Sequence, residues 1–307
     1  MELSALFETC FVIIALMLVG FFGARRGVFP AGFSKAVSAL IVNVFLVATI
    51  FRSIASGAAG IAAEELPHVL LIICLAIALA YVLGRATLAL FGKKYGADAS
   101  MELSISVMNN LLIGLPVLDA IYGPTAVLIA GLTSLPFNLL LYTYGVWRLE
   151  PGKRGSGGVR LKEILSPCVV STLLALVFFV LHLPVPGALD RLFSAAAACS
   201  MPLSMIVIGI TMGSEDLHKA LRDRRVYLVA LVRLVLAPAL TWLLLGLLTD
   251  NTLLLKSCVA VAGCPTGIVV PILTLRSERD AALASNSVIV TTLLSLITLP
   301  VLLMLLG

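Results

Sequence analysis

The chain has 307 residues, of which 61% are hydrophobic and 12% are charged. So few charged side chains cannot cover a water-soluble globule of this length, so the composition excludes a soluble domain and predicts an integral membrane protein. The net charge of +5 is then better explained by basic loops on one side of a membrane than by nucleic-acid binding, for which the sequence has no motif.

Apolar runs of about 20 residues, the length that crosses a bilayer as a helix, recur ten times. We expect spans at residues 4–24, 36–56, 67–91, 99–121, 124–147, 163–182, 192–213, 226–248, 255–275 and 282–306. The first run has no basic residues ahead of it and no clear cleavage site, which predicts a retained helix rather than a signal peptide. The predicted fold class is therefore an all-α membrane protein with ten transmembrane helices.

Lysine and arginine gather in the loops that follow the odd-numbered spans. These residues are Arg25, Arg26, Lys35, Arg85, Lys93, Lys94, Arg148, Lys153, Arg154, Arg160, Lys162, Lys219, Arg222, Arg224, Arg225, Arg276 and Arg279. Because basic loops stay in the cytoplasm, we expect the odd-numbered loops there and both termini on the outer side of the cell membrane, which is the inner membrane in a bacterium.

Several polar side chains fall inside the first five spans. Asn43 and Asn138 either face a binding site or bond across helices, as amides in membranes commonly do. Glu102, at the cytoplasmic start of the fourth span, is expected to stay solvated. Asp119 is a candidate proton carrier, although its closeness to residues 122–124 favours a position at the outer surface.

Proline and glycine interrupt the fourth span in Asn109-Asn110-Leu-Leu-Ile-Gly114-Leu-Pro116 and the ninth in Cys264-Pro265-Thr266-Gly267-Ile-Val-Val-Pro271. Non-helical backbone persists at membrane depth only where protein buries it or where it lines a wet cavity. Two breaks at matching places therefore predict a shared binding site where the helices cross, the alternative being simple kinks in packed helices. The residues expected to bind substrate are Asn109, Asn110, Gly114, Pro116, Pro265, Thr266 and Gly267, with Asn43 and Asn138.

The helical segment after each break is expected to start at Gly114-Leu-Pro116 or at Pro265-Thr266-Gly267. Its free N–H groups and positive partial charge would then point at the crossing. The amides of Asn109 and Asn110 would add donors without adding a fixed charge. The pattern favours an anionic ligand.

The longest polar stretch, residues 148–162, reads as a flexible cytoplasmic linker between two five-span units, 1–147 and 163–307. An odd number of spans in the first unit forces the second unit to insert with the opposite orientation. We therefore predict inverted repeats in which the fourth and ninth spans are equivalent, broken and crossed.

Arg233 and the six cysteines are the remaining residues of note in the apolar spans. Arg233 lies about seven residues into the eighth span, so its long stem is expected to snorkel to the cytoplasmic surface, with pairing to an acid or contact with a passing anion as the alternatives. The six cysteines lie within or at the ends of apolar spans without C-x-x-C spacing, which predicts small buried hydrophobes, with no metal site and no cofactor.

Asn109, Gly114-Leu-Pro116 and Tyr122-Gly123, together with the run from Cys264 to Pro271, resemble the fourth- and ninth-helix motifs of the auxin efflux carrier family. That family includes plant PIN-type carriers and bacterial organic-acid carriers. Further similar segments are Gly20-Phe-Phe-Gly23, Arg25-Arg26-Gly27, Asn43-Val-Phe-Leu46 and Arg233-Leu-Val-Leu-Ala-Pro238. The resemblance covers essentially the whole chain.

The resemblance implies the ten-helix fold of the bile acid sodium symporter superfamily and a homodimer. It also implies a scaffold domain from spans 1, 2, 6 and 7, and a transport domain from spans 3–5 and 8–10 that shifts as an elevator. Val47 stands where many members have proline, and Thr266 replaces the glutamine of the plant motif. Auxin itself is therefore not implied.

Taken together, these features predict a secondary active transporter or facilitator of a small organic anion, a carboxylate such as a dicarboxylate or an auxin-like acid, and not an enzyme. The crossing has no carboxylate to hold Na⁺, which favours H⁺ coupling or uniport. An intramembrane enzyme acting on lipid or peptide substrates is the competing class, but the sequence shows no catalytic acid pair, nucleophile with its base, or metal set. Matched breaks also suit an alternating site better than a channel.

Overall fold

The computed structural model describes residues 3–30, 32–55, 61–150 and 164–306. These residues form helices and turns, and the β-type pairing among them is one isolated bridge between Met108 and Thr266. Seven helical segments are long and apolar enough to cross a membrane, and three shorter apolar helices accompany them. The fold agrees with the predicted all-α class and with an integral membrane protein.

Helices in the first half of the chain follow the expected spans closely. They are α1 Leu3–Arg25, α2 Phe33–Leu40, the π-helical turn η1 Ile41–Phe45, α3 Leu46–Ala55, η2 Ala63–Glu65, α4 Leu66–Tyr95, α5 Ala99–Ser106, η3 Asn110–Gly114, α6 Leu115–Tyr122, α7 Pro124–Leu140, η4 Leu141–Gly145 and α8 Val146–Leu149. The predicted linker at 148–162 lies, from residue 151 onward, outside the described residues.

The second half contains α10 Pro167–Val180, α11 Gly187–Ala198, α12 Ser200–Ser214, α13 Leu217–Arg222, α14 Arg225–Leu231, η5 Val232–Leu236, α15 Ala237–Leu245, α16 Thr252–Ala262, α17 Val269–Arg276 and α18 Ala282–Leu306. The seventh predicted span, 192–213, is longer than expected. It starts at Gly187 and has a joint at Cys199, between α11 and α12.

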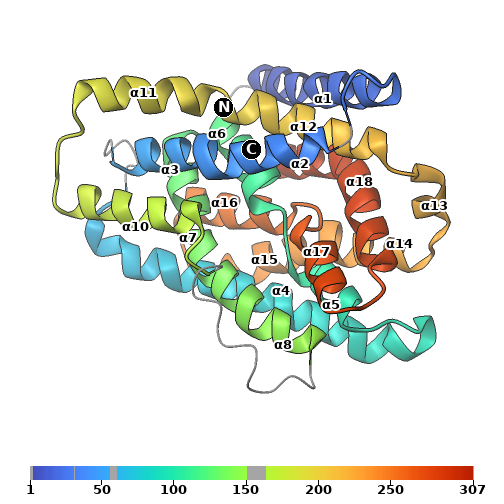
Figure 1. Ribbon diagram of the computed structural model, residues 1–307. Helices are drawn as coiled ribbons and strands as arrows, with labels where there is room; N and C mark the ends of the chain where they lie inside the picture. The colour runs from blue at the N-terminus through green and yellow to red at the C-terminus, as the bar shows by residue number, and fades with distance from the viewer. Residues whose placement is uncertain (1–2, 31, 56–60, 151–163, 307) are drawn as a thin grey trace.

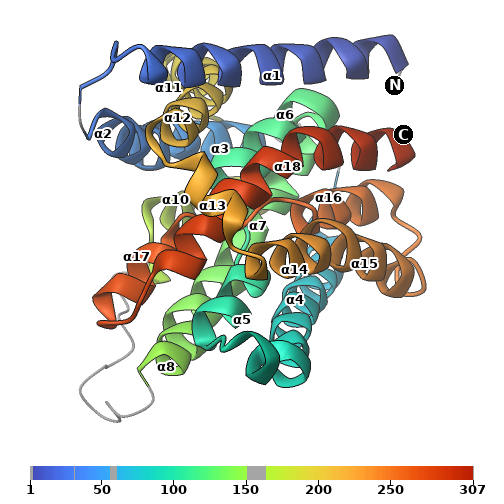
Figure 2. The ribbon, with the colours of Figure 1, turned by 90° about the vertical axis from the view of Figure 1, so that its right-hand side faces the viewer.

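Helix α1 lies along α12 at the top of Figure 2, whereas α4 and α5 lie toward the bottom. Helix α3 contacts α10, α11 and α7. Helix α4 contacts α5, α7, α15 and α16. The start of α1 and the end of α18 lie near each other (Figure 1), and in Figure 2 α8 and α17 extend toward the opposite side.

Glycine residues let α1 and α12 approach almost backbone to backbone. A Cβ atom on Gly209 would lie 1.9 Å from the carbonyl oxygen of Met17, and one on Gly20 would lie 2.0 Å from that of Ile206. Small residues serve this purpose in membranes, where helices associate through close packing rather than through exclusion of water. The contact therefore ties α1 and α12 into one unit.

Candidate functional site

Two helices break and cross at the centre of the molecule. After α5 the chain is extended at Val107 (φ −95°, ψ 115°), and it becomes helical again only after Asn109. The second break joins α16 to α17. The Asn109 N–H donates to the Pro265 carbonyl at 2.9 Å, and the Gly267 N–H donates to the Val107 carbonyl at 2.9 Å. Each break thus satisfies backbone groups of the other, as a water-poor environment requires.

The position of the break in the fourth span differs from the expected one. Gly114 and Pro116 lie inside the helical stretch Asn110–Tyr122, so the prediction that the second segment starts at Gly114-Leu-Pro116 is wrong. Pro116 is accommodated in the first turn of α6, directly after the widened π turn η3, where its missing N–H costs little. A Cβ on Gly114 would lie 3.1 Å from the Cys264 sulfur, so this glycine serves the packing of one break against the other.

The break in the ninth span lies where the sequence predicts it. Residues Pro265, Thr266 and Gly267 fall between α16 and α17. Gly267 permits the crossing, because a Cβ there would lie 3.0 Å from the Met108 carbonyl oxygen. The buried Thr266 hydroxyl donates to the Ser104 carbonyl at 2.7 Å, and its N–H donates to the Thr291 hydroxyl at 3.0 Å. Thr266 therefore ties the break to α5 and α18.

A small cavity opens beside the crossing. Asn109 and Ile268 line it from the two breaks, α12 contributes residues 207, 208, 211 and 212, and α18 contributes residues 288, 289 and 292. The hydroxyls of Ser38, Thr211 and Thr292 and the amide of Asn109 are its polar groups. Its volume of about 30 Å³ suits one or two water molecules but not an organic acid.

The other amides of the predicted site have different surroundings. Asn110 is buried at the start of η3, and its side-chain nitrogen has no hydrogen-bond partner among the described residues. Asn43 and Asn138 do not line the cavity beside the crossing. Asn43 is exposed and donates to the Ala39 carbonyl, whereas Asn138 donates to the Ser166 hydroxyl at 3.1 Å, which links α7 to α10. Asp119 lies in the last turn of α6 and is partly buried.

Arg233 is the functional candidate whose position the sequence analysis missed. Its side chain is fully buried, its Nε donates to the Cys264 carbonyl at 2.9 Å, and its Nη1 donates to the Ile105 carbonyl at 2.9 Å. The expectation that it snorkels is therefore wrong. Helix C-termini leave carbonyls without donors, and a guanidinium has five N–H groups to offer them. An arginine inside an apolar span, in a chain with two broken helices, was the available signal.

Glu102 is also fully buried, so the prediction that it stays solvated is wrong. Arg148 donates to its Oε2 from Nε at 2.9 Å and from Nη2 at 2.6 Å, and the Tyr144 hydroxyl donates to Oε1. Charge-assisted bonds of this kind replace the solvation that a carboxylate loses on burial. Glu102 therefore ties α5 to η4 and α8.

The carboxylate of Asp98 begins α5, in the turn that follows α4. It accepts the Ser100 N–H at 2.9 Å and the Arg279 Nη1 at 2.8 Å. Burial alone would raise the pKa of Asp98, but these hydrogen bonds and the charge of Arg279 outweigh burial and hold it below its usual value. Arg279 also donates to the Leu149 carbonyl, so this end of α5 is bound to α8 and to the turn before α18.

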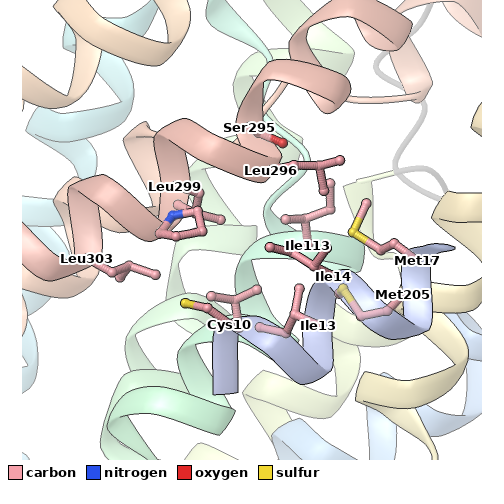
Figure 3. Close-up of a pocket in the computed structure, with 12 residues that line it drawn as sticks. Cys10, Ile13, Ile14, Met17, Ile113, Met205, Ser295, Leu296, Leu299 and Leu303 are labelled. Carbon is pink, nitrogen blue, oxygen red and sulfur yellow. The ribbon is translucent and has the colours of Figure 1, made fainter. Parts of the chain in front are cut away.

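A second cavity, also of about 30 Å³, lies between α1 and α18 (Figure 3). Cys10, Ile13 and Met17 of α1 and Met205 of α12 face Ser295, Leu296, Leu299 and Leu303 of α18, with Ile113 of η3 beside them. Its lining is almost wholly apolar. Together the two cavities show that side chains incompletely fill the space between α18 and the α1–α12 pair.

The comparisons with known proteins agree with this architecture. A family model described as "Membrane transport protein" matches residues 5–157 and 156–303. An uncharacterized transporter of Methanothermobacter thermautotrophicus is 24% identical over 95% of this chain and 96% of its own length. Uncharacterized transporter YfdV of Escherichia coli is 25% identical over 76% of each chain. The chain therefore belongs to the membrane transport protein family, whose members are related to the auxin efflux carriers, as the sequence motifs predict.

Proposed function

We propose that this chain is a secondary transporter or facilitator of a small organic anion, a carboxylate, which it binds at the crossing and moves by elevator-type alternating access. The observation that carries this proposal is the balance of charge at the crossing. Arg233 brings a full positive charge there, and its two hydrogen-bond acceptors are neutral carbonyls. Its Nη2 has no acceptor among the described residues.

The helix ends at the crossing add to this positive charge. Helix Asn110–Tyr122 and α17 both begin there, and a helix N-terminus carries roughly half a positive charge. The opposite, negative ends belong to α5 and to the segment after α16, where Arg233 binds the carbonyls. The only fully buried carboxylate among the described residues, that of Glu102, is engaged by Arg148 and Tyr144. An anion is the ligand that such a site attracts.

The cavity beside Asn109 supports binding at the seam between the crossing and α12. The Asn109 amide and the hydroxyls of Ser38 and Thr292 can donate hydrogen bonds to a carboxylate without adding a fixed charge. The Thr211 hydroxyl already donates to the Val207 carbonyl. Because its volume is too small for an organic acid, substrate binding requires α12 and the crossing to separate. Movement of the helices that form the crossing against the α1–α12 unit would open the cavity. It would also expose the site to each side of the membrane in turn.

The proposed orientation places both chain ends outside the cell membrane. Arg25, Lys93, Lys94 and Arg148 lie in the last turns of their helices, at the side that we assign to the cytoplasm. Arg276 ends α17 in the same way. This arrangement follows the positive-inside rule.

The proposal is tested by binding and flux measurements on purified protein. Thermal unfolding with malonate, malate, benzoate and indole-3-acetate identifies anions that stabilise the fold, and proteoliposomes then report their flux. We expect Asn109→Ala to weaken binding of a stabilising anion about 10- to 100-fold, since a lost hydrogen bond to a charged group costs about 1.5–3 kcal/mol.

Asn286→Ala is the matched control, because this amide lies near the start of α18 and contacts Asp223 rather than the cavity. It should leave binding and flux unchanged. Equal anion affinity in Asn109→Ala and the unmodified protein would refute the assigned site.

A further inference from the structure

The crossing contains two backbone carbonyls of the kind that bind small cations in transporters. In such transporters, the C-terminal ends of broken helices and the carbonyls of the adjoining unwound backbone together form cation sites at membrane depth. In this chain these groups are the Ile105 carbonyl, in the last turn of α5, and the Cys264 carbonyl, just after α16. They come from opposite halves of the chain and meet at one point.

A guanidinium already occupies that point. Nε and Nη1 of Arg233 reach the two carbonyls at 2.9 Å each, and the side chain has no exposed surface. The arginine is presented by η5, a π-helical turn in the middle of the eighth span. Widened turns of this type commonly mark functional positions in helices.

Sodium does not fit this arrangement. A bound Na⁺ would have to share the same two carbonyls with a fixed positive charge, in a region where water does not screen the repulsion. Residues 104–110 and 263–268 contain no carboxylate that could offset two adjacent cations. The hydroxyl of Thr266 is also engaged, as the donor to the Ser104 carbonyl.

We propose that Arg233 is a tethered cation: it neutralises the C-terminal ends of both broken helices, holds the crossing together and makes its assembly independent of sodium. Arg233 acts here as a positioning residue, through the two breaks rather than by contact with a substrate. The proposal deepens the proposed transport function by defining the ion requirement of the same site. Its test reads the ion dependence of folding instead of flux, so the two proposals can fail separately.

The test compares thermal unfolding of the purified protein in sodium, potassium and choline chloride at equal ionic strength. The unmodified protein should melt at the same temperature in all three salts. Arg233→Gln should melt lower by about 5 °C or more, because two buried carbonyls lose their donors, and sodium should restore part of that loss when choline does not. Arg233→Lys keeps the charge, so its melting temperature should lie between those of the unmodified protein and Arg233→Gln. It should melt at the same temperature in all three salts.

Thr266→Val is the control at the same crossing, since it removes a neutral donor to a buried carbonyl. It should lower the melting temperature equally in every salt. Specific stabilisation of the unmodified protein by sodium would overturn the proposal, and so would an Arg233→Gln variant that melts like the unmodified protein. If Arg233→Gln does not fold in any salt, Arg233→Lys decides: a gain of sodium dependence despite the retained charge contradicts the tethered-cation role.

Discussion

At the scale of single residues, burial of charge distinguishes two kinds of contact. Among the described residues the fully buried charged side chains are Glu102 and Arg233. Glu102 is matched by Arg148, an opposite charge, whereas Arg233 binds neutral carbonyls. The first contact ties α5 to α8, and the second leaves a positive charge at the crossing. The first is structural, and the second supports our proposal of an anionic ligand.

Glu102→Gln tests the structural contact. The amide keeps the shape of the side chain but loses the charge that Arg148 and Tyr144 contact, so we expect a destabilisation of about 2–3 kcal/mol and a lower melting temperature. Glu150→Gln is the control, because Glu150 accepts one bond from the Ser277 hydroxyl. Similar melting temperatures for the two variants would show that the Glu102 cluster contributes no special stability.

At the scale of helices, the sequence predicts the presence of both breaks but the position of only one. In the ninth span, Pro265 and Gly267 mark the break directly. In the fourth span the break falls at Val107, Met108 and Asn109, which include neither proline nor glycine. Gly114 lies in the π turn η3, and Pro116 lies in the first turn of α6. The first break follows from pairing with the second, a long-range contact that local sequence signals do not contain.

The α1–α12 contact gives a prediction at this scale. Gly209→Ala places a methyl group against the Met17 carbonyl oxygen, so the helices must separate, and overpacking of this kind costs about 1–3 kcal/mol. Gly187→Ala, at the start of α11, has open space at the added methyl group and should change stability by less than about 0.5 kcal/mol. Thermal unfolding compares the two, and equal effects would contradict the close contact.

At the scale of the whole molecule, composition and apolar patterning predict the all-helical membrane architecture. Seven of the predicted apolar runs coincide with helices that are long and apolar enough to cross a membrane, because hydrophobic length is a local property that a bilayer selects. The other three runs overlap the shorter apolar helices Asn110–Tyr122, Pro167–Val180 and Thr252–Ala262. The buried positions of Arg233 and Glu102 were not predictable in this way. Their hydrogen-bond partners lie far along the chain or on a neighbouring helix. The sequence of one span therefore predicts that Glu102 is solvated and that Arg233 reaches the surface.

The central claim is that the two broken helices move against the α1–α12 unit and thereby carry an anion through the membrane. One flux measurement tests this claim most directly. Ile208 of α12 and Ile289 of α18 line the cavity at that seam, so Ile208→Cys with Ile289→Cys, in a background without other cysteines, can be bridged by a reducible thiol cross-linker. The control pair, Met17→Cys with Met205→Cys, bridges α1 to α12 within one unit. In proteoliposomes carrying the most stabilising of the four acids, we predict that bridging the first pair stops flux until reduction, while bridging the control pair does not. Undiminished flux through the bridged first pair would contradict the account.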